Sequence, residues 1–146
     1  MRPRLGLATV MAALFPAAAL AGSDSDMLAK FGLIGSWALD CHAPPSMGNP
    51  FQTFVPSNAG DPLRQLIVGD PNRDRTVPVH DVALLPHDQL QLSFAQNTVT
   101  VTVVLAKDKG HIRPVESITS DGQTIVKDGI VQRSGQRTLW LEKCPG

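Results

Sequence analysis

Short segments in which apolar and polar residues alternate constrain the fold of this chain most strongly. Between Thr98 and Val103 every second residue is Val, with Thr between, and residues 89–94 alternate in the same way. A period of two places one set of side chains on a single face of a β-strand. Because only residues 95–97 separate the two segments, we expect a hairpin. Its core-facing side chains would be Leu90, Leu92, Phe94, Val99, Val101 and Val103.

Turn-forming residues, mainly Gly, Pro, Asn and Asp, divide the rest of the chain into further short segments. We expect strands over residues 33–41, 51–55, 63–68, 77–85, 111–119, 124–126, 130–133 and 138–143. Only residues 25–32 read as a helix, with Ser25 or Asp26 as its cap and Gly32 as its stop. The pattern predicts an all-β fold, an antiparallel barrel or sandwich of about eight strands with a short N-terminal helix.

The first 21 residues have the pattern of a secretory signal peptide. Arg2 and Arg4 precede an apolar stretch that ends in Ala19-Leu20-Ala21. Cleavage after Ala21 would leave a single, slightly acidic domain over residues 22–146, located in the periplasm or secreted. Gly22, not Cys, follows the cleavage point, so we expect no lipid anchor. No later stretch approaches the roughly 20 apolar residues of a membrane-spanning helix.

The sequence contains two cysteines, Cys41 and Cys144, near the two ends of the predicted domain. Exported proteins meet an oxidising environment, so we expect one disulfide, against the alternatives of free thiols or a metal site. Trp37 and Trp140 each precede a cysteine by four residues, which on a strand is the same face. The two indoles would then pack side by side beneath the bridge. Such a bond requires parallel end strands, an odd strand count, or one cysteine in a loop.

Gly35-Ser36-Trp37 resembles the G-x-W signature of the lipocalins and the wider calycin group. The resemblance implies a β-barrel in which an arginine of the last strands, Arg133 or Arg137, packs over Trp37. We expect Trp37, Trp140 and Arg137 to contribute to ligand binding. An exported barrel with this opening and a single disulfide is similar as well to small bacterial inhibitors of secreted metalloproteases.

Histidines and aspartates form the remaining candidates for chemistry. His80-Asp81 and His87-Asp88 are sequential pairs, and neighbours on a strand point to opposite faces, so we expect exposed residues without a His–Asp hydrogen bond. Residues 70–74 have the oxygen spacing of a calcium loop. Arg75 stands where such a loop needs Gly, so an Asx-rich turn is favoured and calcium binding is left open. Nucleophile and phosphate-loop motifs are absent. We therefore expect no catalytic residue, metal or cofactor.

Charge and composition narrow the function classes. The chain has 13 basic and 13 acidic residues, 5% aromatics and no Tyr, without a basic stripe, which disfavours nucleic-acid binding. We expect an exported, monomeric, non-enzymatic module that binds a small apolar ligand or an exported protein. Contact surfaces would be the 41–50 and 69–77 segments. The alternatives are an inhibitor of a secreted hydrolase such as a protease, with residues 22–29 as a flexible insertion arm, and an enzyme using His80 or His87. A cavity behind the two tryptophans would favour the binding of a small ligand over the other hypotheses.

Overall fold

The computed structural model describes residues 23–146, so the predicted signal peptide, residues 1–21, lies outside the described residues. Within residues 23–146 there are one helix and ten strands. The elements are α1 (Asp24–Phe31), β1 (Gly35–Ala38), β2 (Phe51–Val55), β3 (Leu63–Ile67), β4 (Arg75–Leu85), β5 (Gln89–Gln96), β6 (Val99–Asp108), β7 (His111–Thr119), β8 (Thr124–Lys127), β9 (Ile130–Val131) and β10 (Glu142–Lys143). The predicted all-β class with a short N-terminal helix is confirmed.

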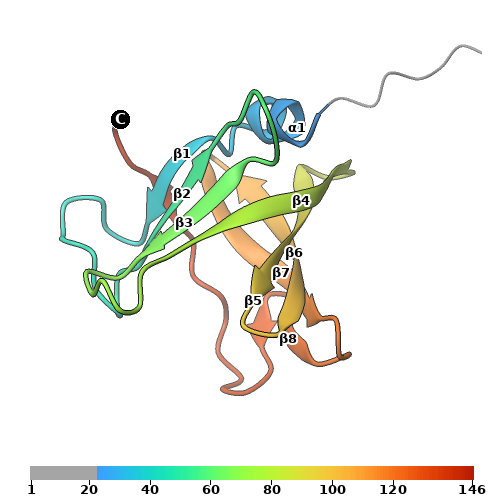
Figure 1. Ribbon diagram of the computed structural model, residues 1–146. Coiled ribbons are helices and arrows are strands. Elements are labelled where there is room, and N and C mark those ends of the chain that lie inside the picture. The colour runs from blue at the N-terminus through green and yellow to red at the C-terminus, as the bar shows by residue number, and fades with distance from the viewer. Residues whose placement is uncertain (1–22) are drawn as a thin grey trace, which may run out of the picture.

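All ten strands form one antiparallel sheet in the order β10-β1-β2-β3-β4-β5-β6-β7-β8-β9. The sheet curls into a half-barrel (Figure 1). Leu141, just before β10, exchanges two backbone hydrogen bonds with Ile112 of β7, at 3.1 and 2.7 Å, while β10 pairs with β1. The C-terminal segment thus joins β7 to β1, and β8 and β9 extend beyond this connection.

The curl follows from residues that interrupt regular pairing. The β4–β5 register shifts between His80 and Ala83, where Asp81 has a φ of 54°, and the β6–β7 register shifts between Val104 and Leu105. Such bulges bend a strand and increase its twist.

The sequence predicted a strand over residues 138–143, but only Glu142–Lys143 is one. Thr138 instead donates its hydroxyl to Pro114 O at 2.6 Å, which holds the preceding segment in an irregular conformation.

The predicted β5–β6 hairpin is confirmed, and it supplies much of the core. Leu92 pairs directly with Val103, and Phe94 with Val101, so these side chains share the inner face of the half-barrel. Burying an aliphatic or aromatic side chain of this size contributes about 1.5–3 kcal/mol. The buried cluster runs from the helix across the sheet and contains Leu28, Phe31, Leu33, Trp37, Phe54, Val79, Val82, Leu90, Leu92, Phe94, Val101, Val103, Leu105, Ile112 and Leu141.

Helix α1 closes one end of the half-barrel (Figure 1). It begins with a capping box in which the Ser23 hydroxyl accepts from Asp26 N and the Asp26 carboxylate from Ser23 N. The prediction that Ser25 or Asp26 is the cap is therefore wrong, because Ser25 binds the β2–β3 loop at Ser57 instead. The predicted stop at Gly32 is confirmed, and its φ of 85° is one that glycine adopts readily.

Two lysines of the sheet attach the C-terminal end of α1. Lys107 of β6 donates to Phe31 O at 2.7 Å and lies 4.6 Å from the Phe31 ring centroid. Lys143 of β10 donates to Gly32 O at 3.1 Å. Cations are favourable where a helix presents its unpaired carbonyls. With Leu28 and Phe31 buried beneath it, α1 is a fixed cover for this end.

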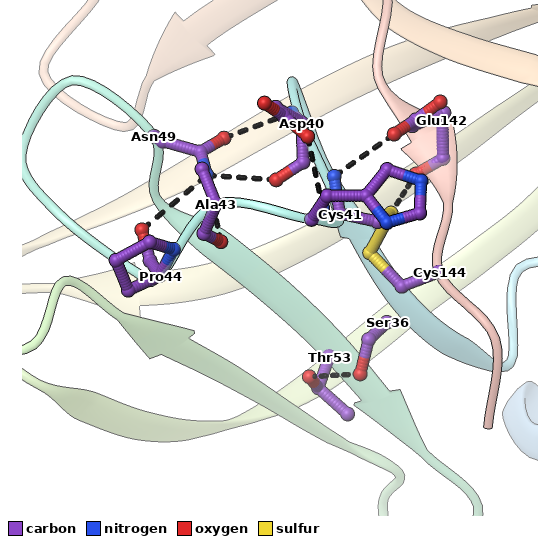
Figure 2. The surroundings of a disulfide bond; sticks show 10 residues. Ser36, Asp40, Cys41, Ala43, Pro44, Asn49, Thr53, Glu142 and Cys144 are labelled. Atoms are coloured by element: carbon purple, nitrogen blue, oxygen red, sulfur yellow. Dashed lines mark hydrogen bonds between the residues drawn. A yellow bond between two sulfur atoms is a disulfide. The ribbon is translucent and has the colours of Figure 1, made fainter.

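The predicted disulfide between Cys41 and Cys144 is confirmed, with the two Cα atoms 5.2 Å apart (Figure 2). Strands β1 and β10 are antiparallel, and Cys41 lies in the turn after β1, so the loop alternative is the correct one. Cys41 N donates to Glu142 Oε1 at 2.8 Å, and the Asn49 side chain bonds both N and O of Asp40. The disulfide and the Cys41–Glu142 bond hold the start of the 40–50 loop against β10, and Asn49 connects the two ends of the loop.

Candidate ligand-binding site

A cavity of about 100 Å³ lies on the inner face of the half-barrel, and we call it the interior cavity. It is walled by β2, β3, β5, β6, β7 and the C-terminal segment. Its lining side chains are mostly apolar: Gln52, Phe54, Arg64, Leu92, Phe94, Val103, Leu105, Ile112, Pro114 and Leu141. Pockets for small organic molecules typically combine apolar walls with a few polar groups, here Gln52 and Arg64.

A second space of about 210 Å³, the outer hollow, adjoins the interior cavity. The two share Arg64 and Phe94 among their lining residues. The outer hollow is lined by Arg64, Leu66, Arg75, Val77, Phe94, Ala95, Gln96 and Asn97. Because Arg75, Gln96 and Asn97 are exposed, this hollow faces solvent at the β5–β6 turn and the start of β4.

Arg64 is the ionisable group between the two spaces. In β3 it pairs with Phe54, so both side chains point inward. Its Cζ lies 4.3 Å from the Phe94 ring centroid, and its Nε and Nη2 donate to Gln52 Oε1 at 3.2 and 3.0 Å. Burial lowers the pKa of the Arg64 guanidinium to about 10, because desolvation disfavours the charged form. The side chain is fixed by an aromatic face and a neutral oxygen.

The tryptophans predicted to bind ligand lie in different environments. Trp37 is 2% exposed within the core, and its Nε1 donates to Leu33 O at 2.8 Å. Trp140 is 38% exposed. Because Trp37 pairs with Lys143, the Trp140 side chain leaves the opposite face of the C-terminal segment. The prediction that the two indoles pack side by side is therefore wrong, and neither lines the interior cavity or the outer hollow.

The cation over Trp37 also differs from the one expected. Lys143 of β10 places its Nζ 5.5 Å from the Trp37 ring centroid, whereas Arg133 and Arg137 are exposed. Arg137 forms an isolated bridge with Ile130 and lines neither space. Lys143, beside Cys144, was missed because the resemblance implies an arginine at this place. A search for any cation in the last strand, lysine as well as arginine, would have found it.

A third, shallow space on the outer surface is lined by Asp108, Lys109, His111 and Trp140. Arg113 lies with its Cζ 4.6 Å from the Trp140 ring centroid. Its Nε is the one buried side-chain nitrogen or oxygen within residues 23–146 that has no hydrogen-bond partner. The neighbouring Leu139 is 62% exposed. This surface is separate from the inner face.

The histidines do not form a joint site. His80 Nδ1 lies 2.9 Å from Asp81 Oδ2, so the prediction that a sequential His-Asp pair is poorly placed for a hydrogen bond is wrong here. The positive φ of Asp81 at the bulge turns its side chain back toward His80. His87 is exposed in the β4–β5 turn, with a φ of 62°. Neither histidine lines the interior cavity or the outer hollow.

The aspartates of residues 70–74 bond their own loop. Asp70 Oδ1 accepts from Asn72 N at 3.0 Å, as in an Asx turn, and Asp74 Oδ1 accepts from Val68 N at 2.7 Å. Arg73 lies 3.6 Å from Asp70. Over residues 23–146 no cluster of three or more His, Cys, Asp or Glu is placed to hold a metal ion. These carboxylates therefore stabilise the β3–β4 turn.

Residues 22–29, predicted to be a flexible inhibitory arm, largely belong to α1, because Leu28 is fully buried and the helix is capped. Gly22 lies outside the described residues. The predicted contact loops 41–50 and 69–77 do touch each other: a Cβ on Gly69 would lie 2.7 Å from Pro45 O. Gly69 has a φ of 76°, so glycine is favoured there for two reasons.

Arg64 and Gln52 were missed in the sequence. Residues 63–67 are Leu-Arg-Gln-Leu-Ile, in which apolar and polar residues do not alternate, and every residue of β3 is half-buried, so the pattern does not tell which face is inward. The strand register reveals the inward face, because Arg64 pairs with buried Phe54.

The chain matches no protein-family model, no curated protein and no solved structure. Among the described residues, no helix has the length and apolar character needed to cross a membrane.

Proposed function

We propose that this chain is an exported, non-enzymatic binding module that takes a small ligand into the interior cavity of its half-barrel. The observation that carries the proposal is the mostly apolar cavity of about 100 Å³ beside the outer hollow of about 210 Å³. An apolar cavity that holds benzene measures about 150 Å³, so a ring-sized ligand needs the interior cavity together with part of the outer hollow. A ligand of this class would occupy the interior cavity and extend past Phe94 into the outer hollow.

Three features support a lipocalin-like relationship as part of this proposal. The G-x-W opening at Gly35-Ser36-Trp37 forms β1, and its Trp is buried. A cation from the last strand, Lys143, lies over that Trp. A short helix precedes β1 and covers one end of the curled sheet. In this chain the space for a ligand lies away from Trp37, on the inner face around Phe94.

The disulfide supports an exported location, because such bonds persist in oxidising compartments. The proposal places the mature chain in the periplasm or the medium. The enzyme alternative has less support, since His80 and His87 lie outside both spaces. The inhibitor alternative loses its predicted insertion arm, because that segment is the capped helix α1.

Binding of toluene, a small neutral probe, tests the proposed function. We expect saturable shifts of the methyl NMR signals of Leu92, Val103 and Leu105, which line the cavity. Val103→Phe should fill the cavity and abolish these shifts. Val104→Phe is the matched control, because Val104 neighbours Val103 on the opposite face of β6 and lies outside the lining. Absence of toluene shifts in the wild-type cavity methyls, or equal loss in both variants, would contradict the proposal.

A further inference from the structure

Arg64 has fewer partners than its charge calls for. Its Nε and Nη2 donate to the single neutral oxygen of Gln52, and its Nη1 donates to no other residue within 23–146. The ion pairs in this range involve Arg73 with Asp70 and His80 with Asp81, so Arg64 has no carboxylate partner. A cation removed from water is costly unless it is paired and hydrogen-bonded. Arg64 is half-buried, and its Nη1 is not among the buried nitrogens that lack a partner, so this donor is in contact with solvent and available to a ligand.

The surroundings of Arg64 have a consistent charge. The residues that line the interior cavity and the outer hollow include two arginines, Arg64 and Arg75, and no Asp or Glu. Arg75 is held by Asn72 O and Asp74 O through Nη1, both at 2.9 Å, beside the exposed side of the hollow. A site lined by one sign of charge attracts the opposite charge and raises its local concentration. The path from solvent to Arg64 thus favours an anion.

Apolar surface lies directly beside the free donor. Phe94 stacks against the guanidinium and lines both spaces, and Leu92, Val103 and Leu105 continue the wall of the interior cavity. A ligand that bound Arg64 by charge alone would leave this surface in contact with water. A ligand with an anionic head and an apolar body satisfies both, since planar guanidinium groups bind carboxylates well and burial of apolar area is favourable.

We propose that the ligand is a small organic anion whose carboxylate accepts hydrogen bonds from Arg64 and whose apolar body lies against Phe94, Leu92 and Val103. This inference rests on the proposed function and specifies its ligand class. The free Nη1 is the main donor, because the Gln52 oxygen already engages Nε and Nη2. The interior cavity of about 100 Å³ and the adjoining part of the outer hollow limit the apolar body to about one ring or a short chain. A long-chain fatty acid exceeds this space.

A matched pair of ligands separates the charge from the shape. Phenylacetate and phenylacetamide have the same ring and nearly the same size, but only the first is an anion at neutral pH. We expect phenylacetate to bind the wild-type chain about tenfold more tightly, since the additional free energy of a hydrogen bond to a charged group corresponds to about a tenfold change in Kd. The titration would follow the Leu92 and Val103 methyl signals and the Arg64 Nε–H signal by NMR. Hexadecanoate should bind more weakly than phenylacetate.

Two variants assign the preference to Arg64. Arg64→Met keeps a long side chain without charge, and we expect it to bind both ligands with similar affinity, at the level of the amide. Arg137→Met removes the same charge from an exposed position outside both spaces, and it should keep the tenfold preference. If Arg64→Met does not fold, Arg64→Lys retains a cation and should keep part of the preference.

The outcomes distinguish this inference from the proposed function. If toluene and phenylacetamide bind in the cavity and wild-type protein shows no preference for phenylacetate, the binding module stands and the anion inference is overturned. The same holds if Arg64→Met keeps the preference, or if hexadecanoate binds more tightly than phenylacetate. If none of the probes shifts the cavity methyls, the proposed function fails as well. A tenfold preference lost in Arg64→Met and retained in Arg137→Met supports the inference.

Discussion

The two regions of the half-barrel core, the end covered by α1 and the cavity region around Arg64, each place a cation on an aromatic ring. At the covered end, Lys107 lies 4.6 Å from the Phe31 ring centroid and donates to the Phe31 carbonyl. In the cavity region, Arg64 lies 4.3 Å from the Phe94 ring centroid and donates to the neutral oxygen of Gln52 alone. Both cations donate to a neutral oxygen of the fold, but Arg64 borders the interior cavity and the outer hollow, whereas Lys107 lines neither space.

Packing differs between the same two regions. Around α1, Leu28 and Leu33 are fully buried and Trp37 is 2% exposed, and none of the three lines the interior cavity. Around Arg64, the inner face leaves the interior cavity and the outer hollow. Proteins commonly give up local stability where they bind ligands. The difference indicates that the covered end holds the fold together and the cavity region is available for binding.

The largest expected effect comes from truncating the core at the covered end. Trp37→Ala should lower the free energy of unfolding by about 3–5 kcal/mol, because it leaves a large cavity among packed side chains. Trp140→Ala is the matched control on the outer face and should cost about 1 kcal/mol, mainly its contact with Arg113. Urea denaturation followed by circular dichroism measures both. Similar losses would show that Trp37 has no special role in the covered end.

The disulfide gives the next largest effect. Replacing Cys41 and Cys144 by Ser should cost about 2–4 kcal/mol, because the bond closes a loop across 103 positions and restricts the unfolded chain. Thermal unfolding of the double variant, beside the wild type with and without reductant, measures this cost. The variant and the reduced wild type should agree. Since neither cysteine lines the interior cavity, toluene binding should persist at temperatures well below the transition.

Most of the fold was predictable because its signals are local. The alternation in residues 89–94 and 98–103 located the central hairpin, and Gly32 marked the end of α1. An alternating strand can be recognised from its own residues, even when the strands that pair with it are unknown. The segment 138–143 was predicted wrongly, because its conformation depends on a distant acceptor, Pro114 O, which the local pattern does not contain.

The candidate site was less predictable, because it depends on which residues the curl brings together. Arg64 and Phe94 are 30 positions apart and meet only through the β3, β4 and β5 registers. The spacing of Trp37 and Trp140 from the cysteines predicts that both lie on one face, but residues 138–140 are not a strand, and Trp140 lies on the outer face. The bond between His80 and Asp81 was missed because the bulge at Asp81 breaks the strict alternation.

A smaller effect tests the cation at the covered end. Lys107→Met should lower the free energy of unfolding by about 1–2 kcal/mol, because Phe31 O loses a charge-assisted hydrogen bond at the end of α1. Hydrogen exchange should show faster exchange of the last amides of α1 in this variant. Lys127→Met, at an exposed position in β8, is the control and should change neither quantity measurably. Unchanged exchange in Lys107→Met would contradict a role for this lysine in attaching α1.

The smallest expected effect on stability is at Arg64. Removing this cation should leave the free energy of unfolding nearly unchanged or raise it, whereas removing Lys107 should lower it. Arg64→Met should leave the free energy of unfolding within about 1 kcal/mol of wild type, or raise it, because an apolar side chain removes a cation whose desolvation, seen in the lowered pKa of Arg64, opposes its two hydrogen bonds to Gln52. The Gln52 oxygen loses its donor, but Gln52 is only half-buried and can bond water instead. Urea denaturation of Arg64→Met and Lys107→Met side by side measures the contrast. A loss of 2 kcal/mol or more in Arg64→Met would mean that Arg64 serves the fold, since a group retained for an external anion stabilises the complex and contributes little without it.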